Sequence, residues 1–130
     1  MAIKAIKRQS EYKYIPLEER GEKKPTTFYF KPLDKETKAR LEDKLVTVNK
    51  DETINISNAT YILEAFRICV VKVENFVDEK NREVPIVRGK DGLVVYDFLD
   101  MLPDSIIQEV GQTIINISKF PDKADLFLGE

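Results

Sequence analysis

The sequence predicts a small α+β domain: about three helices packed with a short antiparallel sheet or hairpins, preceded by a flexible N-terminal arm. Apolar residues recur at helical spacing in three segments, and short runs of β-branched and aromatic residues stand between turn residues. At 130 residues, 42% of them hydrophobic, the chain is long enough to build one core. We therefore expect a flexible basic arm at residues 1–25, a globular domain at 26–120 and a short tail at 121–130.

The arm is rich in lysine, arginine and glutamate. Because such a segment buries little apolar surface, we expect it to be partly disordered. Residues 26–30 follow and are β-branched and aromatic, with Pro25 before them and Pro32 behind. They predict a short strand, and the flanking prolines favour a place at the edge of a sheet.

The charged segment after Pro32 predicts the first helix, with Asp34 as its N-cap. Its apolar stripe is narrow, so most of its surface should face water. Alternating apolar and polar residues on both sides of a polar loop at 49–52 then predict a β-hairpin of residues 46–48 and 53–56.

The central helix should begin at a cap formed by Ser57 or Asn58 and run to about Asn75. It is the most hydrophobic element, which predicts that it lies in the middle of the domain. A polar turn and an extended segment follow it. Residues 93–95 either pair with that segment or lead into a short helix at residues 96–99.

The last helix is predicted from Pro103, which suits a first helical turn, to about Ser118. Gly111 lies inside it and costs about 1 kcal/mol relative to alanine. A glycine at that cost suggests that another element packs closely against the helix. Phe120 and Pro121 should end it.

The residue types present exclude several kinds of chemistry. The chain has no histidine and one cysteine, Cys69, so histidine-dependent catalysis and cysteine-cluster metal sites are ruled out. Cys69 stands among apolar residues and is expected to be a buried core residue. The aspartate pairs Asp97 with Asp100 and Asp122 with Asp125 could bind a metal or act as acid and base. Such pairs are common on protein surfaces, and we expect no catalytic residue, cofactor or metal.

Charge is distributed unevenly along the chain. Residues 1–50 hold 13 basic and 8 acidic residues, and residues 51–130 hold 8 basic and 15 acidic ones. Such polarity suits head-to-tail self-association or a charged partner protein, although ordinary solvated surface charge explains it too. The acidic isoelectric point disfavours nucleic acid. The chain has neither an apolar run of membrane-spanning length nor a signal-peptide pattern, so we expect a cytoplasmic protein and no membrane partner.

Aromatic residues are the best candidates for contacts with other proteins, because aromatic anchors are enriched at interfaces. Five lie in the basic half of the chain and two lie near its end; core packing is the competing explanation for most of them. The seven candidates are Tyr12, Tyr14, Phe28, Tyr29, Phe30, Phe120 and Phe127.

One stretch carries a resemblance to a known family. It has Glu74-Asn75-Phe76, a polar turn at residues 78–81, Val84-Pro85, and Leu102-Pro103 at the start of an isoleucine-rich helix. With the order of elements before it, this stretch resembles the tail assembly chaperones of long, non-contractile-tailed (siphophage-type) bacteriophages. The similarity extends over residues 26–120.

The resemblance implies a non-enzymatic oligomer in the host cytoplasm that binds the tape-measure protein, the tail-tube protein or both during tail morphogenesis. Members of this family are absent from the finished virion. A first alternative is a small structural adapter retained in the phage tail, neck or baseplate. A second is a carboxylate-based enzyme or metal protein, which the residue types disfavour.

Overall fold

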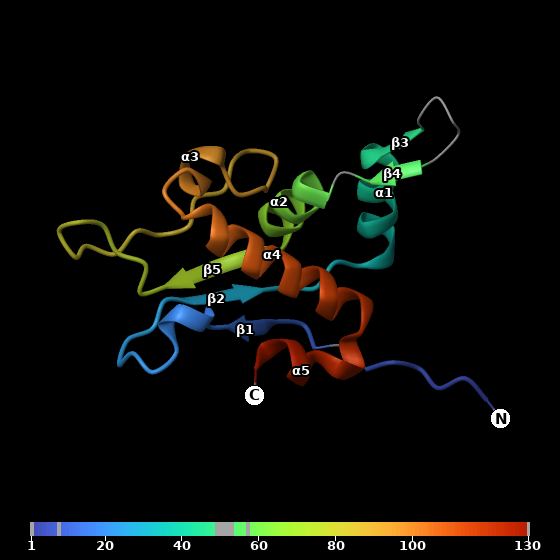
Figure 1. The fold of residues 1–130 in the computed structure, drawn as a ribbon, viewed down its shortest axis with the longest axis horizontal. Coiled ribbons are helices and arrows are strands. Elements are labelled where there is room, and N and C mark those ends of the chain that lie inside the picture. Colours follow the sequence, from blue (N-terminus) through green and yellow to red (C-terminus); the bar gives the residue numbers. More distant parts are fainter. Residues whose placement is uncertain (1, 8, 49–53, 57, 130) are drawn as a thin grey trace.

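The protein contains a three-stranded antiparallel sheet in the order β1 (Tyr12–Tyr14), β2 (Thr27–Phe30) and β5 (Val70–Glu74). Helices α2 (Asn58–Cys69) and α4 (Asp104–Lys119) lie side by side next to this sheet (Figure 1). The predicted α+β class is confirmed. The structure is a computed structural model and describes residues 2–7, 9–48, 54–56 and 58–129.

The first helix and the hairpin form as predicted. Helix α1 spans Lys35–Leu45, and the backbone N–H of Thr37 donates a hydrogen bond of 2.7 Å to the Asp34 carboxylate, which caps the helix. Strands β3 (Val46–Val48) and β4 (Ile54–Ile56) pair as an antiparallel hairpin. The predicted loop at 49–52 and the candidate cap Ser57 lie outside the described residues.

The prediction for the central helix is wrong at its C-terminal end. Helix α2 ends at Cys69, and Val70–Glu74 form strand β5. The β-branched valines in this segment favour a strand, and β5 places Val73 beside Phe28 of β2. Strand β2 is therefore central, with β1 on its other side, so the expected edge position of residues 26–30 is also wrong.

The N-terminal arm is shorter than predicted. Residues Tyr12 to Tyr14 are paired with β2, and a short 3₁₀ helix, Leu17–Glu19, follows them. The Tyr14 hydroxyl donates a 2.6 Å hydrogen bond to Glu109 of α4, so the segment is attached to the core from two sides. Residues 2–7 remain exposed, and Figure 1 shows the N-terminal segment extending away from the domain.

The predicted tail is also structured. A 3₁₀ turn at Pro121–Lys123 leads into helix α5 (Ala124–Leu128), whose Ala124 is buried. The Phe127 ring stacks on Phe120 with 6.5 Å between centroids. The Arg20 guanidinium donates a hydrogen bond to the carbonyl oxygen at the end of α5, which joins the two chain ends.

Between β5 and α4 the chain forms two small loops and a short helix. Isolated bridges join Val77 to Glu83 and Arg88 to Val94, and helix α3 spans Tyr96–Leu99. Both alternatives for residues 93–95 are thus realised, because Val94 pairs and the next residues become helical. Asn75 has a left-handed φ of 59°, which asparagine tolerates better than most residues.

Helices α2 and α4 cross at Gly111. This confirms the close packing that was predicted from the presence of a glycine inside a helix. A Cβ atom at Gly111 would lie 2.5 Å from Ile62 Cγ2 and 2.7 Å from the Ile62 carbonyl oxygen. The glycine therefore permits a backbone approach that any larger residue would block. Within the described residues, the helices lack the length and apolarity needed to cross a membrane.

Candidate functional site

Four of the seven candidate aromatics are buried, so the competing explanation, core packing, holds for them. Antiparallel pairing places Tyr12 opposite Phe30 and Tyr14 opposite Phe28, and all four side chains point into the core. Because side chains alternate along a strand, the same pairing sends the residue between Phe28 and Phe30 to the other face. These four aromatic side chains pack in the hydrophobic core and are therefore not available as surface anchors.

The other three candidates remain accessible. Tyr29 lies on the outer face of β2, where the Lys72 ammonium is 5.2 Å from its ring centroid. A hydrogen bond with Glu74 raises the pKa of Tyr29 and lowers that of Glu74. Phe120, which follows α4, and Phe127 of α5 stack on each other. An interface role for these three residues stays a prediction.

A groove of about 660 Å³ opens between α1, α2 and the segment before α3. We call it the Arg67 groove. Its apolar lining comes from Leu41 and Leu45 of α1, Ile68 of α2, and Leu93. The remaining lining side chains are polar or aromatic: Thr37, Lys44, Thr60, Glu64, Arg67 and Tyr96.

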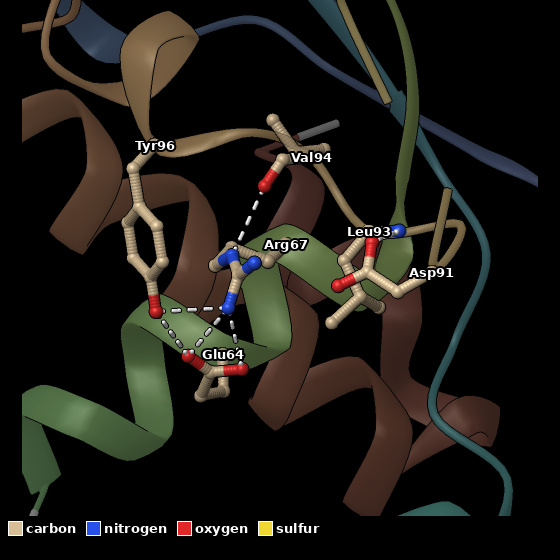
Figure 2. A network of polar contacts seen from close by, with 6 residues as sticks. All are labelled: Glu64, Arg67, Asp91, Leu93, Val94 and Tyr96. Carbon is tan, nitrogen blue, oxygen red and sulfur yellow. Dashed lines mark hydrogen bonds and ion pairs between the residues drawn. The ribbon is translucent and has the colours of Figure 1, made fainter. Parts of the chain in front are cut away.

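Arg67 organises one wall of this groove (Figure 2). Its Nη1 donates to both carboxylate oxygens of Glu64 at 3.1 and 3.2 Å and to the Tyr96 hydroxyl at 2.9 Å. The Tyr96 hydroxyl in turn donates to Glu64 at 3.2 Å. The guanidinium carbon also lies 4.0 Å from the Tyr96 ring centroid, a cation–π distance.

The same arginine fixes the segment before α3 to helix α2. Arg67 Nε donates to the Val94 carbonyl at 3.0 Å, and the Val94 N–H donates to the Arg67 carbonyl at 3.0 Å. Asp91 accepts a hydrogen bond from the Leu93 backbone, and Arg88 donates to the carbonyls of Gly92 and Val70. The wall that carries Leu93 is thus held by hydrogen bonds at several points.

The groove combines an apolar floor with a paired arginine and glutamate and an exposed tyrosine. The side chains of Arg67 and Glu64 are only 11% and 20% exposed and already neutralise each other, so neither is presented as a reactive group. Tyr96 is about half exposed, at 52%. An apolar floor beside a fixed tyrosine and arginine is the composition of protein-binding hot spots.

A second, smaller hollow of about 170 Å³ lies beside Phe76, just after the C-terminal end of β5. We call it the Phe76 pocket. Phe28, Phe76, Leu102 and Ile106 supply its apolar lining, with Pro16 and Pro103 beside them. Glu18, Glu19 and Thr26 are the polar residues around it.

The Phe76 pocket joins residues from both ends of the stretch that carries the family resemblance. Phe76 belongs to its first motif and Leu102 and Pro103 to its last, and the Phe76 ring meets Phe98 edge-on at 5.7 Å. Reasoning from the sequence identified these residues but treated them as ends of elements. Their convergence depends on β5 being a strand, which the sequence reasoning missed.

The described part of the chain contains no group of three or more histidine, cysteine, aspartate or glutamate side chains that could hold a metal ion. Cys69 is buried, and desolvation raises the pKa of its thiol to about 12. Asp122 and Asp125 lie beside Lys7 in a shallow hollow.

Comparison of the chain with models of protein families, with curated proteins and with solved structures gives no match. The family resemblance of residues 74–103 therefore stays a hypothesis.

Proposed function

We propose that this chain is a non-enzymatic assembly chaperone of a bacteriophage tail. It binds the tape-measure protein, the tail-tube protein or both while the tail is built, and it acts as an oligomer. The Arg67 groove is the observation that supports this proposal best. The resemblance of residues 74–103 to tail assembly chaperones supplies the identity of the partners.

The spacing of the groove residues suits a helical partner. On α1 the lining residues run from Thr37 to Leu45, and on α2 they run from Thr60 to Ile68. Each series covers nine residues, and its eight steps of 1.5 Å extend over about 12 Å of helix. A groove of that length between two helices accommodates about two turns of a third helix that presents apolar residues at positions i, i+4 and i+7.

A tape-measure protein offers such a surface before it is enclosed. A long helical protein that is later surrounded by a tube exposes apolar stripes during assembly, and exposed stripes aggregate unless they are covered. The leucines of the groove would cover such a stripe. The exposed Lys44 at the rim favours a partner helix with an acidic residue beside its apolar stripe.

Co-expression with the tape-measure and tail-tube proteins of the same phage, followed by affinity purification, tests the proposal. We expect one or both proteins to co-purify with the chain. Thr60→Arg should abolish capture of a tape-measure protein, because it places a long charged side chain in the groove. Ser105→Arg is the matched control: it introduces the same residue at an exposed hydroxyl position in the first turn of α4, outside the Arg67 groove.

Failure to capture either protein would overturn the proposed function. Capture that Thr60→Arg leaves unchanged would overturn the assignment of the groove. Mass spectrometry of purified virions separates a chaperone from an adapter. A chaperone is absent from the finished particle, whereas a neck, tail or baseplate adapter is present in stoichiometric amounts.

A further inference from the structure

We propose that residues 2–7 of one copy of this chain dock in the Phe76 pocket of a second copy. The side chain of Ile3 fills the pocket, and Lys4 meets the carboxylates of Glu18 and Glu19. Self-association is part of the function proposed above, and this inference identifies the two surfaces that carry it. It is tested on the chain alone, so its outcome is independent of tape-measure or tail-tube binding.

The pocket has the size and lining for one branched aliphatic side chain. Its volume of about 170 Å³ is close to that of an engineered apolar cavity of about 150 Å³ that binds benzene. Phe28, Leu102 and Ile106 line it and are themselves buried, so a side chain that enters would meet apolar atoms on several sides. Filling such a site removes apolar surface of both copies from water.

The N-terminal segment supplies a matching group. Residues 2–7 read Ala-Ile-Lys-Ala-Ile-Lys, so an isoleucine is followed by a lysine twice. Ile3 is fully exposed, and Ile6 is more than half exposed. Within its own copy the segment therefore leaves both isoleucines in water, and a second copy offers a place where one of them is covered.

Charge around the pocket favours this occupant. Glu18 and Glu19 both line the pocket, and the exposed Leu17 precedes them. The adjacent cation, Arg20, is directed elsewhere, because its guanidinium donates to the carbonyls of Ile15 and Leu128. A lysine next to the inserted isoleucine would thus meet two carboxylates at the pocket mouth.

The segment and the pocket are separate surfaces of the chain, so docking between copies is able to link them into chains or rings. The N-terminal segment leaves the domain at the start of β1, whereas Pro16 and Glu18 of the pocket lie beyond the end of that strand (Figure 1). A contact between two different surfaces is heterologous, so each docked copy still offers a free segment or a free pocket. The expected products are open chains or closed rings rather than dimers alone.

Sedimentation velocity of the full chain, over a wide concentration range and with any tag at the C-terminus, tests the inference. We expect the native chain to form species larger than a dimer. Ile3→Glu should weaken association about tenfold or more, because a carboxylate replaces the inserted side chain. Leu126→Glu is the control: it makes the same kind of change at a residue that is 75% exposed on α5 and should leave association unaltered.

A charge exchange identifies the pocket. Lys4→Glu and Glu18→Lys should each weaken association, and the double variant should restore it. A native chain that stays monomeric overturns the inference. Association that persists in Ile3→Glu also overturns it. A third contrary result is association that is lost in Ile3→Glu but unchanged in both Lys4→Glu and Glu18→Lys.

Discussion

Replacing Gly111 by alanine is the sharpest test of how the helices pack. The new Cβ would lie 2.5 Å from Ile62 Cγ2 and 2.7 Å from the Ile62 carbonyl oxygen. An ordinary carbon–carbon contact is about 3.5–4.0 Å. A rotamer change could move the side-chain carbon, but the carbonyl belongs to the backbone of α2. The two helices must therefore separate by about 1 Å.

The magnitude follows from two opposing effects. Overpacking a core typically lowers the free energy of unfolding by about 1–3 kcal/mol. Because the Ile62 carbonyl cannot move without the backbone, we expect a cost of about 3 kcal/mol for Gly111→Ala. The higher helix propensity of alanine relative to glycine offsets about 1 kcal/mol of this cost. The expected net loss is about 2 kcal/mol in the free energy of unfolding, which for a chain of this size lowers Tm by about 8 °C.

Urea and thermal unfolding followed by circular dichroism measure this loss. Gln112→Ala, at the exposed neighbouring position of α4, is the control and should change stability by no more than about 0.5 kcal/mol. Gly111→Val should cost more than Gly111→Ala. A Gly111→Ala protein that is as stable as the native one, or more stable by the propensity gain, would refute the close crossing of α2 and α4.

Three further predictions follow from individual groups. Arg67→Ala should lower the free energy of unfolding by about 2 kcal/mol in urea melts, because it leaves the Glu64 carboxylate and the Val94 carbonyl without their charged donor; an unchanged midpoint would contradict the network. Cys69 should resist a thiol reagent at neutral pH until the protein unfolds, because burial raises the pKa of its thiol to about 12; rapid labelling of the folded protein would contradict its burial. Burial, and secondarily the Glu42 carboxylate, raises the pKa of Tyr61 from 10.0 to about 12, so the folded state favours the protonated phenol. That stability is complete below pH 10 and is lost as pH rises from 10 towards 12, so the urea midpoint should fall across this window and fall less in Tyr61→Phe.

The sequence predicted those features that depend on local chemistry. Asp34 has the short acceptor side chain that a helix N-terminus needs, and it caps α1 as expected. Gly111 was expected at a close contact because it is costly in a helix without one, and α2 crosses α4 there. In both cases the signal lies in one residue and its immediate neighbours.

The features that were missed depend on pairing across long separations. Residues 70–74 continue the apolar pattern of α2, and pairing with β2 tips this valine-rich segment from helix to strand β5. Tyr12 and Tyr14 lie in a highly charged segment, yet they pair with the edge of β2 and their side chains are buried in the core. The Phe76 pocket joins residues from β2, from the loop after β5 and from the start of α4, so its existence follows from the topology.

The central claim is that the Arg67 groove binds a helix of a tape-measure protein. The most direct measurement is isothermal titration calorimetry of the full chain with a purified tape-measure fragment, using the native chain, Thr60→Arg and Ser105→Arg. We predict saturable binding with a negative heat-capacity change for the native chain and for Ser105→Arg, and no binding for Thr60→Arg. Equal binding by all three proteins would contradict it.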